Sequence, residues 1–412
     1  MTTPLKKKQK IGLILSGGGA RAAYQVGVLK AIAELAPHQS SNPFDIICGT
    51  SAGAINGVVL ASRAASFRPA IRSLEAVWQN FTTDQVYETG LRSILHCAYE
   101  WLGPMVLGRL VKVHDSVSLF DNSPLRRLLR RVVPFENIDL AIEKGYLHAI
   151  SISASSYTSG HSTSFFQATP GTVQPWERAR RIGVPAKLSL DHLMASSAIP
   201  IFFPAVKIGD EYFGDGAVRQ LAPISPALHL GADKVLVIGV SGDGQQSSTA
   251  PKRATYPTFA QIAGHMLNSA FIDSLEGDIE RLERVNQTID KIPAHLISES
   301  ETHLRKVDVL VISPSEALDK IAARHVKELP KTVRFFLGRA GANRTSGASI
   351  ISYLLFERGF TSDLISLGYA DAMRQKEKLI PFMEFPSETM VASPSSSNVE
   401  SIDRAKKRDL AL

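Results

Sequence analysis

Residues 11–35, IGLILSGGGARAAYQVGVLKAIAEL, contain the first pattern that indicates the fold class. Ile11–Leu15 is a short apolar run that leads directly into Ser16-Gly17-Gly18-Gly19, which is typical of a buried strand that ends in a tight turn. From Arg21 onward the apolar side chains recur at helical spacing, at Tyr24, Val28, Leu29, Ile32 and Leu35. The stretch therefore predicts a strand, a glycine turn and a helix.

A second strand and helix follow in the same order. Phe44–Cys48 is another apolar run, and Ala52–Ser62 is rich in small residues, as expected of a buried helix. Strand–helix–strand–helix is the pattern of a parallel sheet that is covered by helices. We therefore expect an α/β protein.

Later segments extend this pattern. Strands are expected at 147–153, 162–167, 235–240 and 307–312, with a Pro/Gly/Arg-rich connection at 170–187. Residues 63–131 are expected to be mainly helical, with breaks at Pro104 and Pro124. A long helix is expected at 258–292, with an interruption near Gly277.

The composition indicates one large domain with short polar ends. Residues 1–9 form a polar N-terminal arm, no clear linker interrupts the chain from 10 to 385, and the Ser/Pro-rich and charged residues 386–412 are expected to be a disordered tail. Hydrophobic residues make up 44% and charged residues 21%, which excludes wholesale disorder and a collagen-like fold.

The charge balance is mildly basic. The chain has 46 Lys and Arg residues against 39 Asp and Glu, a net charge of +7, part of it in runs at Lys6-Lys7-Lys8 and Lys406-Lys407-Arg408. Such a balance suits an anionic membrane surface or a nucleic acid. No interleaving of arginine with aromatic residues and no nucleic-acid motif is present, so we expect no nucleic-acid partner.

Cysteine usage and hydropathy favour a cytoplasmic protein. The two cysteines, Cys48 and Cys97, cannot form a disulfide framework and indicate a reducing compartment. The N-terminus mimics a signal peptide, but its apolar run stops at Leu15, short of the roughly 7–15 residues of such segments. The uncharged stretch 46–62 is shorter than the roughly 20 apolar residues of a spanning helix.

The first chemical motif is the GxSxG of Gly49-Thr50-Ser51-Ala52-Gly53. It follows an apolar strand and opens a helix, and a sharp turn in that position holds a serine hydroxyl out of the sheet as a nucleophile. The glycines allow close approach of the backbone, and the helix N-terminus adds a positive dipole end. The alternative is a glycine turn whose Ser51 only caps the helix.

The second motif is the glycine loop, Gly17, Gly18 and Gly19, followed by Arg21. Backbone N–H groups of such a loop can converge on a phosphate or on the oxyanion of an acyl-transfer intermediate. A dinucleotide site would need an acidic residue at the end of the second strand, where this chain has Cys48-Gly49-Thr50. Arg21 is a candidate to support the loop or to bind a substrate phosphate, or is a solvated first-turn residue.

The third motif is the turn Gly214-Asp215-Gly216-Ala217. Alone it is an ordinary turn, because Asp and Gly are favoured there for backbone reasons. With the other two motifs, however, Asp215 supplies a base for Ser51. None of the eleven histidines stands in a context that suggests a catalytic base.

Taken in order, these motifs resemble the patatin-like phospholipase family. The resemblance rests on Gly17–Arg21 as GGGxR, on Gly49–Gly53 as GxSxG and on Asp215-Gly216-Ala217 as the aspartate turn, with support from the segment 195–204, and it covers residues 10–240. Ala217 stands where many members have glycine, and Ala22 stands where glycine is commoner. Neither departure removes a reacting group.

The resemblance implies a three-layer α/β/α fold and a Ser51–Asp215 dyad, with Gly17, Gly18 and Gly19 as the oxyanion hole. Gly49, Gly53 and Gly216 are then motif glycines, and neither a metal nor an organic cofactor is required. The implied function is hydrolysis of phospholipids or other acyl esters, of phospholipase A or lysophospholipase type, by a cytoplasmic enzyme at a membrane surface. The sequence does not indicate the headgroup, the acyl position or the oligomeric state.

Two alternatives remain open at this point. One is an esterase or thioesterase that acts on soluble acyl substrates, and the other is a non-catalytic phosphate- or nucleotide-binding regulator with an inert Ser51. The apolar segment 91–113, which contains Trp101 and is flanked by basic residues, is predicted to be either an interfacial lid or a core helix.

Overall fold

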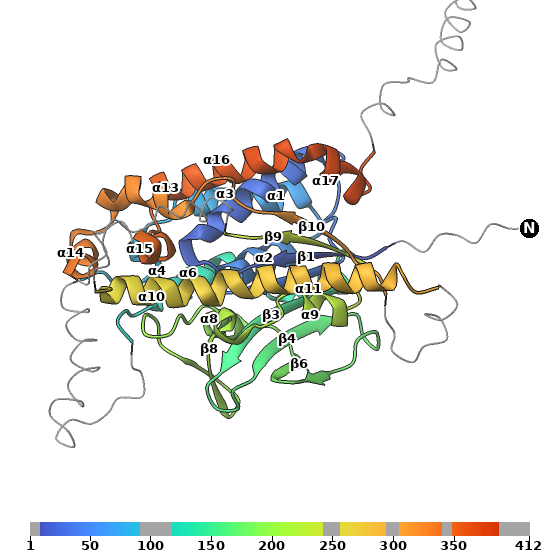
Figure 1. Ribbon diagram of the computed structural model, residues 1–412, viewed down its shortest axis with the longest axis horizontal. Coiled ribbons are helices and arrows are strands. Elements are labelled where there is room, and N and C mark those ends of the chain that lie inside the picture. Colours follow the sequence, from blue (N-terminus) through green and yellow to red (C-terminus); the bar gives the residue numbers. More distant parts are fainter. Residues whose placement is uncertain (1–8, 91–117, 242–255, 294–304, 340–347, 387–412) are drawn as a thin grey trace, which may run out of the picture.

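The computed structural model describes residues 9–90, 118–241, 256–293, 305–339 and 348–386 (Figure 1). The strands are β1 Ile11–Leu15, β2 Ile46–Thr50, β3 Ala149–Ser156, β4 Ser162–Ala168, β5 Trp176–Arg178, β6 Arg181–Pro185, β7 Val206–Ile208, β8 Glu211–Asp215, β9 Lys234–Ile238 and β10 Asp308–Ile312. They form one sheet in the order β10-β9-β1-β2-β3-β4-β6-β5, and β8 pairs with both β3 and β7. The expected lid or core segment 91–113, Cys97, the basic runs and the tail from 387 lie outside the described residues.

The helices surround this sheet. The α-helices are α1 Ala23–Leu35, α2 Ala52–Ser62, α3 Phe67–Gln79, α4 Thr83–Val86, α6 Ser123–Val132, α7 Glu136–Glu143, α8 Leu190–Ser196, α9 Ser225–His229, α10 Phe259–Asn268, α11 Ser274–Ile289, α13 Leu318–His325, α14 Lys331–Arg339, α15 Ala348–Leu354, α16 Arg358–Arg374 and α17 Lys376–Phe382. Short 3₁₀ turns are η1 Gly19–Ala22, η3 Gly216–Arg219 and η6 Val326–Glu328. Pro124 lies in the first turn of α6, directly after the non-helical residues 118–122, so the break predicted there is the start of a new helix.

The half of the sheet that carries the glycine loop is parallel, as predicted. Strands β10, β9, β1, β2 and β3 all run in the same direction. The carboxyl ends of β1 and β2 therefore lie side by side at one edge of the sheet, where parallel α/β sheets bind their ligands.

The other half is mixed, which corrects the expectation of a simple parallel sheet. β3 and β4 are antiparallel because only the short turn 157–161 joins them, too short for a crossover helix. The expected connection at 170–187 contains two strands, β5 and β6, which pair antiparallel at the sheet edge. These two strands carry charged residues, among them Arg178 and Arg181. Their sequences therefore lack the alternation of apolar and polar residues that predicts a strand.

Both faces of the sheet are covered, which makes three layers. Leu13 of β1 belongs to the core cluster that includes α1, α2, α3 and α16, while its neighbour Ile14 belongs to a separate cluster with α9 and α11. The alternation follows from the two-residue period of a strand. Figure 1 shows α16, α1 and α3 on one side of β1 and β9, and α11 and α9 on the other. The predicted three-layer α/β/α fold is confirmed.

The long helix predicted at 258–292 is interrupted at a different place. It consists of α10, the π-helical segment η5 at Ser269–Asp273, and α11, and it continues through Gly277. A π turn inserts an extra residue and changes which side chains face inward. Phe271 of η5 is thereby buried against the glycine loop.

Helix α16, the second-last of the described helices, is docked against α1 through two glycines. A Cβ atom added at Gly27 would lie 2.0 Å from the carbonyl oxygen of Ile365, and one at Gly368 would lie 2.1 Å from that of Tyr24. Tyr24 also donates a hydrogen bond to Asp371 (3.0 Å). This close approach ties the end of the described chain to its first helix. Among the described residues, no helix has the length and apolar character needed to cross a membrane.

Candidate active site

Ser51 lies on a strained turn between β2 and α2. Its backbone angles φ and ψ are 55° and −131°, in a region that residues other than glycine rarely occupy. The flanking glycines make the turn possible, because a Cβ at Gly49 would lie 2.5 Å from the Cα of Ala54 and one at Gly53 would lie 2.3 Å from the carbonyl oxygen of Leu15. This is the geometry expected of a nucleophile elbow.

Sheet register brings Asp215 to this turn. Thr50 at the end of β2 pairs with Ser153 of β3, and the next residue of β3, Ala154, pairs with Asp215 of β8. β4 occupies the other edge of β3, so β2 and β8 follow one another along the same edge, and their ends bring Ser51 and Asp215 together. The Ser51 hydroxyl donates a hydrogen bond of 2.5 Å to Oδ2 of Asp215.

Both groups are held from several directions in a buried site. Ser51 is 2% exposed and Asp215 is fully buried. The second carboxylate oxygen of Asp215 accepts a hydrogen bond from the Ala217 N–H (3.0 Å). The Ser51 N–H donates to the hydroxyl of Ser196 (2.8 Å), which in turn donates to the carbonyl oxygen of Ser153 (2.7 Å).

The environment of Asp215 makes it a stronger base than an ordinary carboxylate. Burial raises the pKa of Asp215 to about 7, and the hydrogen bonds from Ser51 and Ala217 lower the pKa only in part. A carboxyl group with a pKa near neutrality is suited to take a proton and return it.

The turn after Asp215 is tied to the neighbouring strands. A Cβ at Gly216 would lie 2.1 Å from the carbonyl oxygen of Ser153, so only glycine fits there. Gln220 accepts a hydrogen bond from the Thr50 hydroxyl (2.7 Å) and donates one to the Ser153 hydroxyl (2.9 Å). Gln220 thus links the Asp215 turn to the strand that carries Ser51, a role that the sequence analysis did not identify.

The glycine loop lies beside Ser51. A Cβ at Gly17 would lie 3.1 Å from the Cβ of Ser51, and Gly19 lines the same cavity as Ser51. Gly19 has a φ of +54°, and a Cβ there would lie 2.3 Å from the carbonyl oxygen of Tyr353. Within the described ranges, the N–H groups of Gly17, Gly18 and Gly19 have no hydrogen-bond acceptor.

Arg21 is part of the scaffold behind this loop. Its side chain is fully buried and stacks on the ring of Tyr353, with 4.0 Å between the guanidinium carbon and the ring centroid. Nε donates to the Ser352 hydroxyl (2.7 Å), and Nη2 donates to the Ser349 hydroxyl (3.4 Å). These contacts favour loop support over binding of a substrate phosphate, and they argue against a solvated arginine.

An apolar cavity of about 30 Å³ opens at Ser51. Its described lining residues are Gly19, Ser51, Ala52, Ile55, Trp78, Phe81, Val86, Leu125, Ser197, Ile199, Phe203 and Phe356. Trp78, Phe81 and Phe356 form one aromatic group, with ring centroids 5.1–6.4 Å apart. This volume has room for only about one water-sized molecule, so it is the apolar character of the lining, and not the volume, that points to a hydrocarbon chain next to the serine hydroxyl.

In the described part of the chain, no histidine is hydrogen-bonded to Ser51 or Asp215. His192 is instead a helix-capping residue, whose Nδ1 lies 2.8 Å from the Ser189 hydroxyl and whose ring packs against Phe165. Burial lowers the pKa of His192. Among the described residues, Asp215 is thus the side chain to which the Ser51 hydroxyl donates a hydrogen bond.

We expect Gly18→Ala to lower kcat more than it raises KM. A Cβ at Gly18 would lie 2.6 Å from Cγ2 of Val240, so the loop and its N–H groups must shift. Loss of an oxyanion donor typically costs about 10²–10³-fold in kcat. Val240→Ala should make room for the new methyl group, so the double variant should recover turnover. A rise in KM alone, or no recovery in the double variant, would point to a different role for the loop.

The family of the protein follows from these features together with its sequence profile. The profile of the Patatin-like phospholipase family matches residues 13–228, which include β1, Ser51 and Asp215. The chain belongs to the patatin-like phospholipase family.

Individual relatives match parts of the chain. The cGAMP-activated phospholipase of Pseudomonas aeruginosa is 29% identical over 218 residues, which cover 53% of this chain and 55% of the relative. Lysophospholipase nte1 of Aspergillus terreus is 50% identical over 56 residues, 14% of this chain and 3% of the relative. The chain thus spans less than two thirds of either relative.

Solved structures are also similar to the protein. VipD from Legionella pneumophila aligns over 90% of this chain and 67% of its own, with 12% identity and a TM-score of 0.30. ExoU of Pseudomonas aeruginosa, solved with SpcU, aligns over 97% of this chain and 85% of its own, with 16% identity and a TM-score of 0.27.

Proposed function

We propose that the protein is a lipid acyl hydrolase, of phospholipase A or lysophospholipase type, that uses Ser51 and Asp215 as a catalytic dyad. The observation that carries the proposal is the hydrogen bond of 2.5 Å between the buried Ser51 hydroxyl and Asp215, on a strained turn at the carboxyl edge of the sheet. Nucleophile and base need this contact for proton transfer.

The proposed reaction has two halves. Ser51 Oγ attacks the ester carbonyl carbon while its proton passes to Asp215, and the oxyanion is bound by N–H groups of Gly17, Gly18 and Gly19. The ester C–O bond breaks, and the leaving alcohol takes the proton from Asp215. A water molecule then attacks the acyl group with Asp215 again as base, the fatty acid leaves, and the proton returns to Ser51.

The apolar lining of the cavity at Ser51 supports the proposed substrate class. Aromatic and aliphatic side chains surround it, including Trp78 and Phe356, which favours a fatty acyl chain over a polar acyl group. Contact with a membrane surface as a peripheral protein agrees with the net charge of +7. We further propose that residues 10–385 act as one catalytic unit, because the core cluster includes residues from Ile11 to Met383.

The proposal is tested by labelling and by substrate choice. A serine-directed fluorophosphonate should label the wild type, and the wild type should hydrolyse phosphatidylcholine or lysophosphatidylcholine in micelles faster than a short soluble ester such as p-nitrophenyl butyrate. Absence of labelling would favour the non-catalytic regulator. Labelling with preference for the soluble ester or for a thioester would favour the other alternative.

A further inference from the structure

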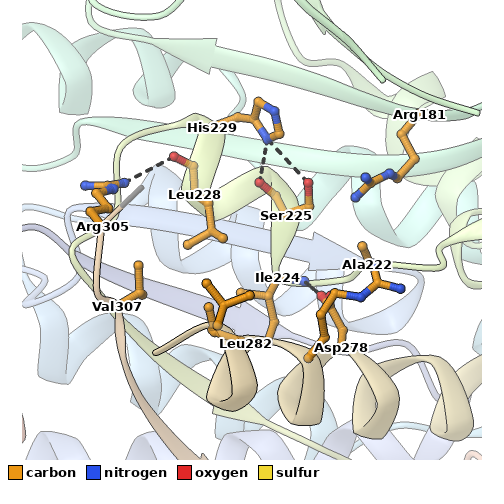
Figure 2. Close-up of a pocket in the computed structure, with 12 residues that line it drawn as sticks. Arg181, Ala222, Ile224, Ser225, Leu228, His229, Asp278, Leu282, Arg305 and Val307 are labelled. Atoms are coloured by element: carbon orange, nitrogen blue, oxygen red, sulfur yellow. Dashed lines mark hydrogen bonds between the residues drawn. The ribbon is translucent and has the colours of Figure 1, made fainter. Parts of the chain in front are cut away.

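A second cavity, of about 370 Å³, lies on the opposite side of the sheet from the cavity at Ser51. It is bounded by α9, α11, β6 and the start of β10 (Figure 2). Its described lining residues are Arg181, Ala222, Ile224, Ser225, Leu228, His229, Asp278, Arg281, Leu282, Val285, Arg305 and Val307. No described residue lines both cavities.

The cavity is rich in arginine. Arg305 is neutralised by Asp233, at 2.7 Å, and also donates to the carbonyl oxygen of Leu228 (3.3 Å). The side chains of Arg181 and Arg281, in contrast, make no hydrogen bond and no ion pair within 4.0 Å among the residues that the structure describes, although both act electrostatically on Asp278. Two guanidinium groups at one cavity are thus available to an anion, and planar guanidinium suits phosphate and carboxylate.

The other polar groups of the cavity do not cancel this charge. Oδ2 of Asp278 already accepts a hydrogen bond from the Ile224 N–H (2.9 Å). Burial raises the pKa of Asp278, while that hydrogen bond and the charges of Arg281 and Arg181 lower it in part, and even an ionised Asp278 offsets only one of the two guanidinium charges. His229 donates through Nδ1 to the carbonyl oxygen of Ser225 (2.8 Å), and burial lowers its pKa, which favours the neutral ring. The described lining therefore has a positive excess near neutral pH.

The floor between the arginines is apolar. Figure 2 shows Arg305 and Arg181 on opposite sides of the cavity, with Leu228, Ile224 and Leu282 between and below them. A small hydrated anion would make no favourable contact with such an apolar floor. A molecule with a charged head and a hydrocarbon body would contact both the arginines and the floor.

We propose that this cavity binds an amphiphile with a phosphate or carboxylate head, which Arg181 and Arg281 hold while its apolar part contacts Ile224 and Leu282. The site is independent of the chemistry at Ser51, because it shares no described residue with that cavity. A binding measurement therefore tests it whether or not the proposed hydrolysis occurs.

The test is calorimetric titration of the full chain with dodecyl phosphate below its critical micelle concentration. Inorganic phosphate supplies the head alone, and dodecyl maltoside supplies the chain with a neutral head. Dodecyl phosphate should bind at least about tenfold more tightly than either, because each alone makes only part of the contacts. Dodecanoate then shows whether the site accepts a carboxylate as well as a phosphate.

Variants locate the binding. The double variant Arg181→Gln/Arg281→Gln should weaken dodecyl phosphate binding by about tenfold or more, as expected for lost charge-assisted hydrogen bonds. Arg281→Lys, which keeps the charge, should bind more tightly than Arg281→Gln. The control is Arg324→Gln on α13, which lies with α16 on the other side of the sheet and should bind like the wild type.

The melting temperature of each variant is measured alongside, and both single Arg→Gln variants are titrated as well. An unchanged Kd in folded Arg→Gln variants would overturn the proposal. So would equal binding of dodecyl maltoside and dodecyl phosphate, or binding of inorganic phosphate as tight as that of dodecyl phosphate.

Discussion

Ser51→Ala is expected to lower lipid hydrolysis by about ten-thousandfold or more while the protein stays folded. The hydroxyl is the only reacting atom that the substitution removes, and it accounts for the shortest hydrogen bond to Asp215. Alanine fits the space of serine, although it shares the strain of the positive φ at this turn. The measurement is kcat/KM on phospholipid micelles, with circular dichroism and thermal unfolding to verify the fold.

A matched control for this variant is Ser62→Ala. Ser62 is also buried, and it lies at the other end of helix α2, where its hydroxyl donates a hydrogen bond to the carbonyl oxygen of Val59 (3.0 Å) and to no other described residue. We expect this variant to hydrolyse lipid within about twofold of the wild type, as for a substitution away from the reacting groups. Most of the activity surviving in a folded Ser51→Ala protein would rule out Ser51 as the nucleophile.

Asp215→Asn is expected to be nearly as damaging to activity, because asparagine keeps the shape but cannot take the proton of Ser51. In the wild type, kcat/KM should rise with pH to a plateau, with a midpoint near the raised pKa of Asp215, about 7. No single histidine substitution should have a comparable effect. A folded His→Ala variant with about a thousandfold loss would favour a triad instead.

Asp215→Asn should also stabilise the protein at alkaline pH. The folded-state pKa of Asp215 is raised from 3.8 to about 7, so the folded state binds the proton more tightly than the unfolded state. Stability is then lost as pH rises from about 4 to about 7, and the cost at higher pH is on the order of 4 kcal/mol at 1.36 kcal/mol per pKa unit. Asparagine mimics the protonated form and avoids this cost.

Denaturant unfolding at several pH values checks this expectation. At pH 8 the free energy of unfolding of Asp215→Asn should exceed that of the wild type by on the order of 4 kcal/mol. This difference should shrink below pH 4. A difference that does not change with pH would show that the carboxyl group titrates normally. The base role would then lose its physical support.

The fold class was predictable from local patterns. A short apolar run, a glycine turn and a helical repeat define β1 and α1, and the same order around Ser51 defines β2 and α2. Local backbone preferences and burial act within a few residues, so they are visible in the chain itself. Edge strands such as β5 escaped prediction, because Trp176–Arg178 has no apolar alternation and forms a strand only by pairing with β6.

The order of the three motifs also singled out Ser51 and Asp215, whose side chains the structure places in hydrogen-bond contact. Their contact, however, spans 164 positions of the chain and depends on β3, along one edge of which β2 and then β8 are paired. No local pattern encodes that register. The raised pKa of Asp215 likewise comes from burial by distant segments rather than from its neighbours in sequence.

The supports of the glycine loop depend most fully on tertiary packing. Tyr353 contacts Gly19 through its backbone carbonyl and contacts Arg21 through its ring, and Phe271 packs on Gly17 from a π turn. Every residue has a backbone carbonyl, so the sequence does not mark the one that contacts the loop. An aromatic side chain in a helix usually belongs to a hydrophobic core, so its presence does not indicate a support of the glycine loop. The amino-acid sequence determined the fold class and indicated the proposed reacting residues, while long-range packing determined the distances and the electrostatic environment on which the proposed chemistry depends.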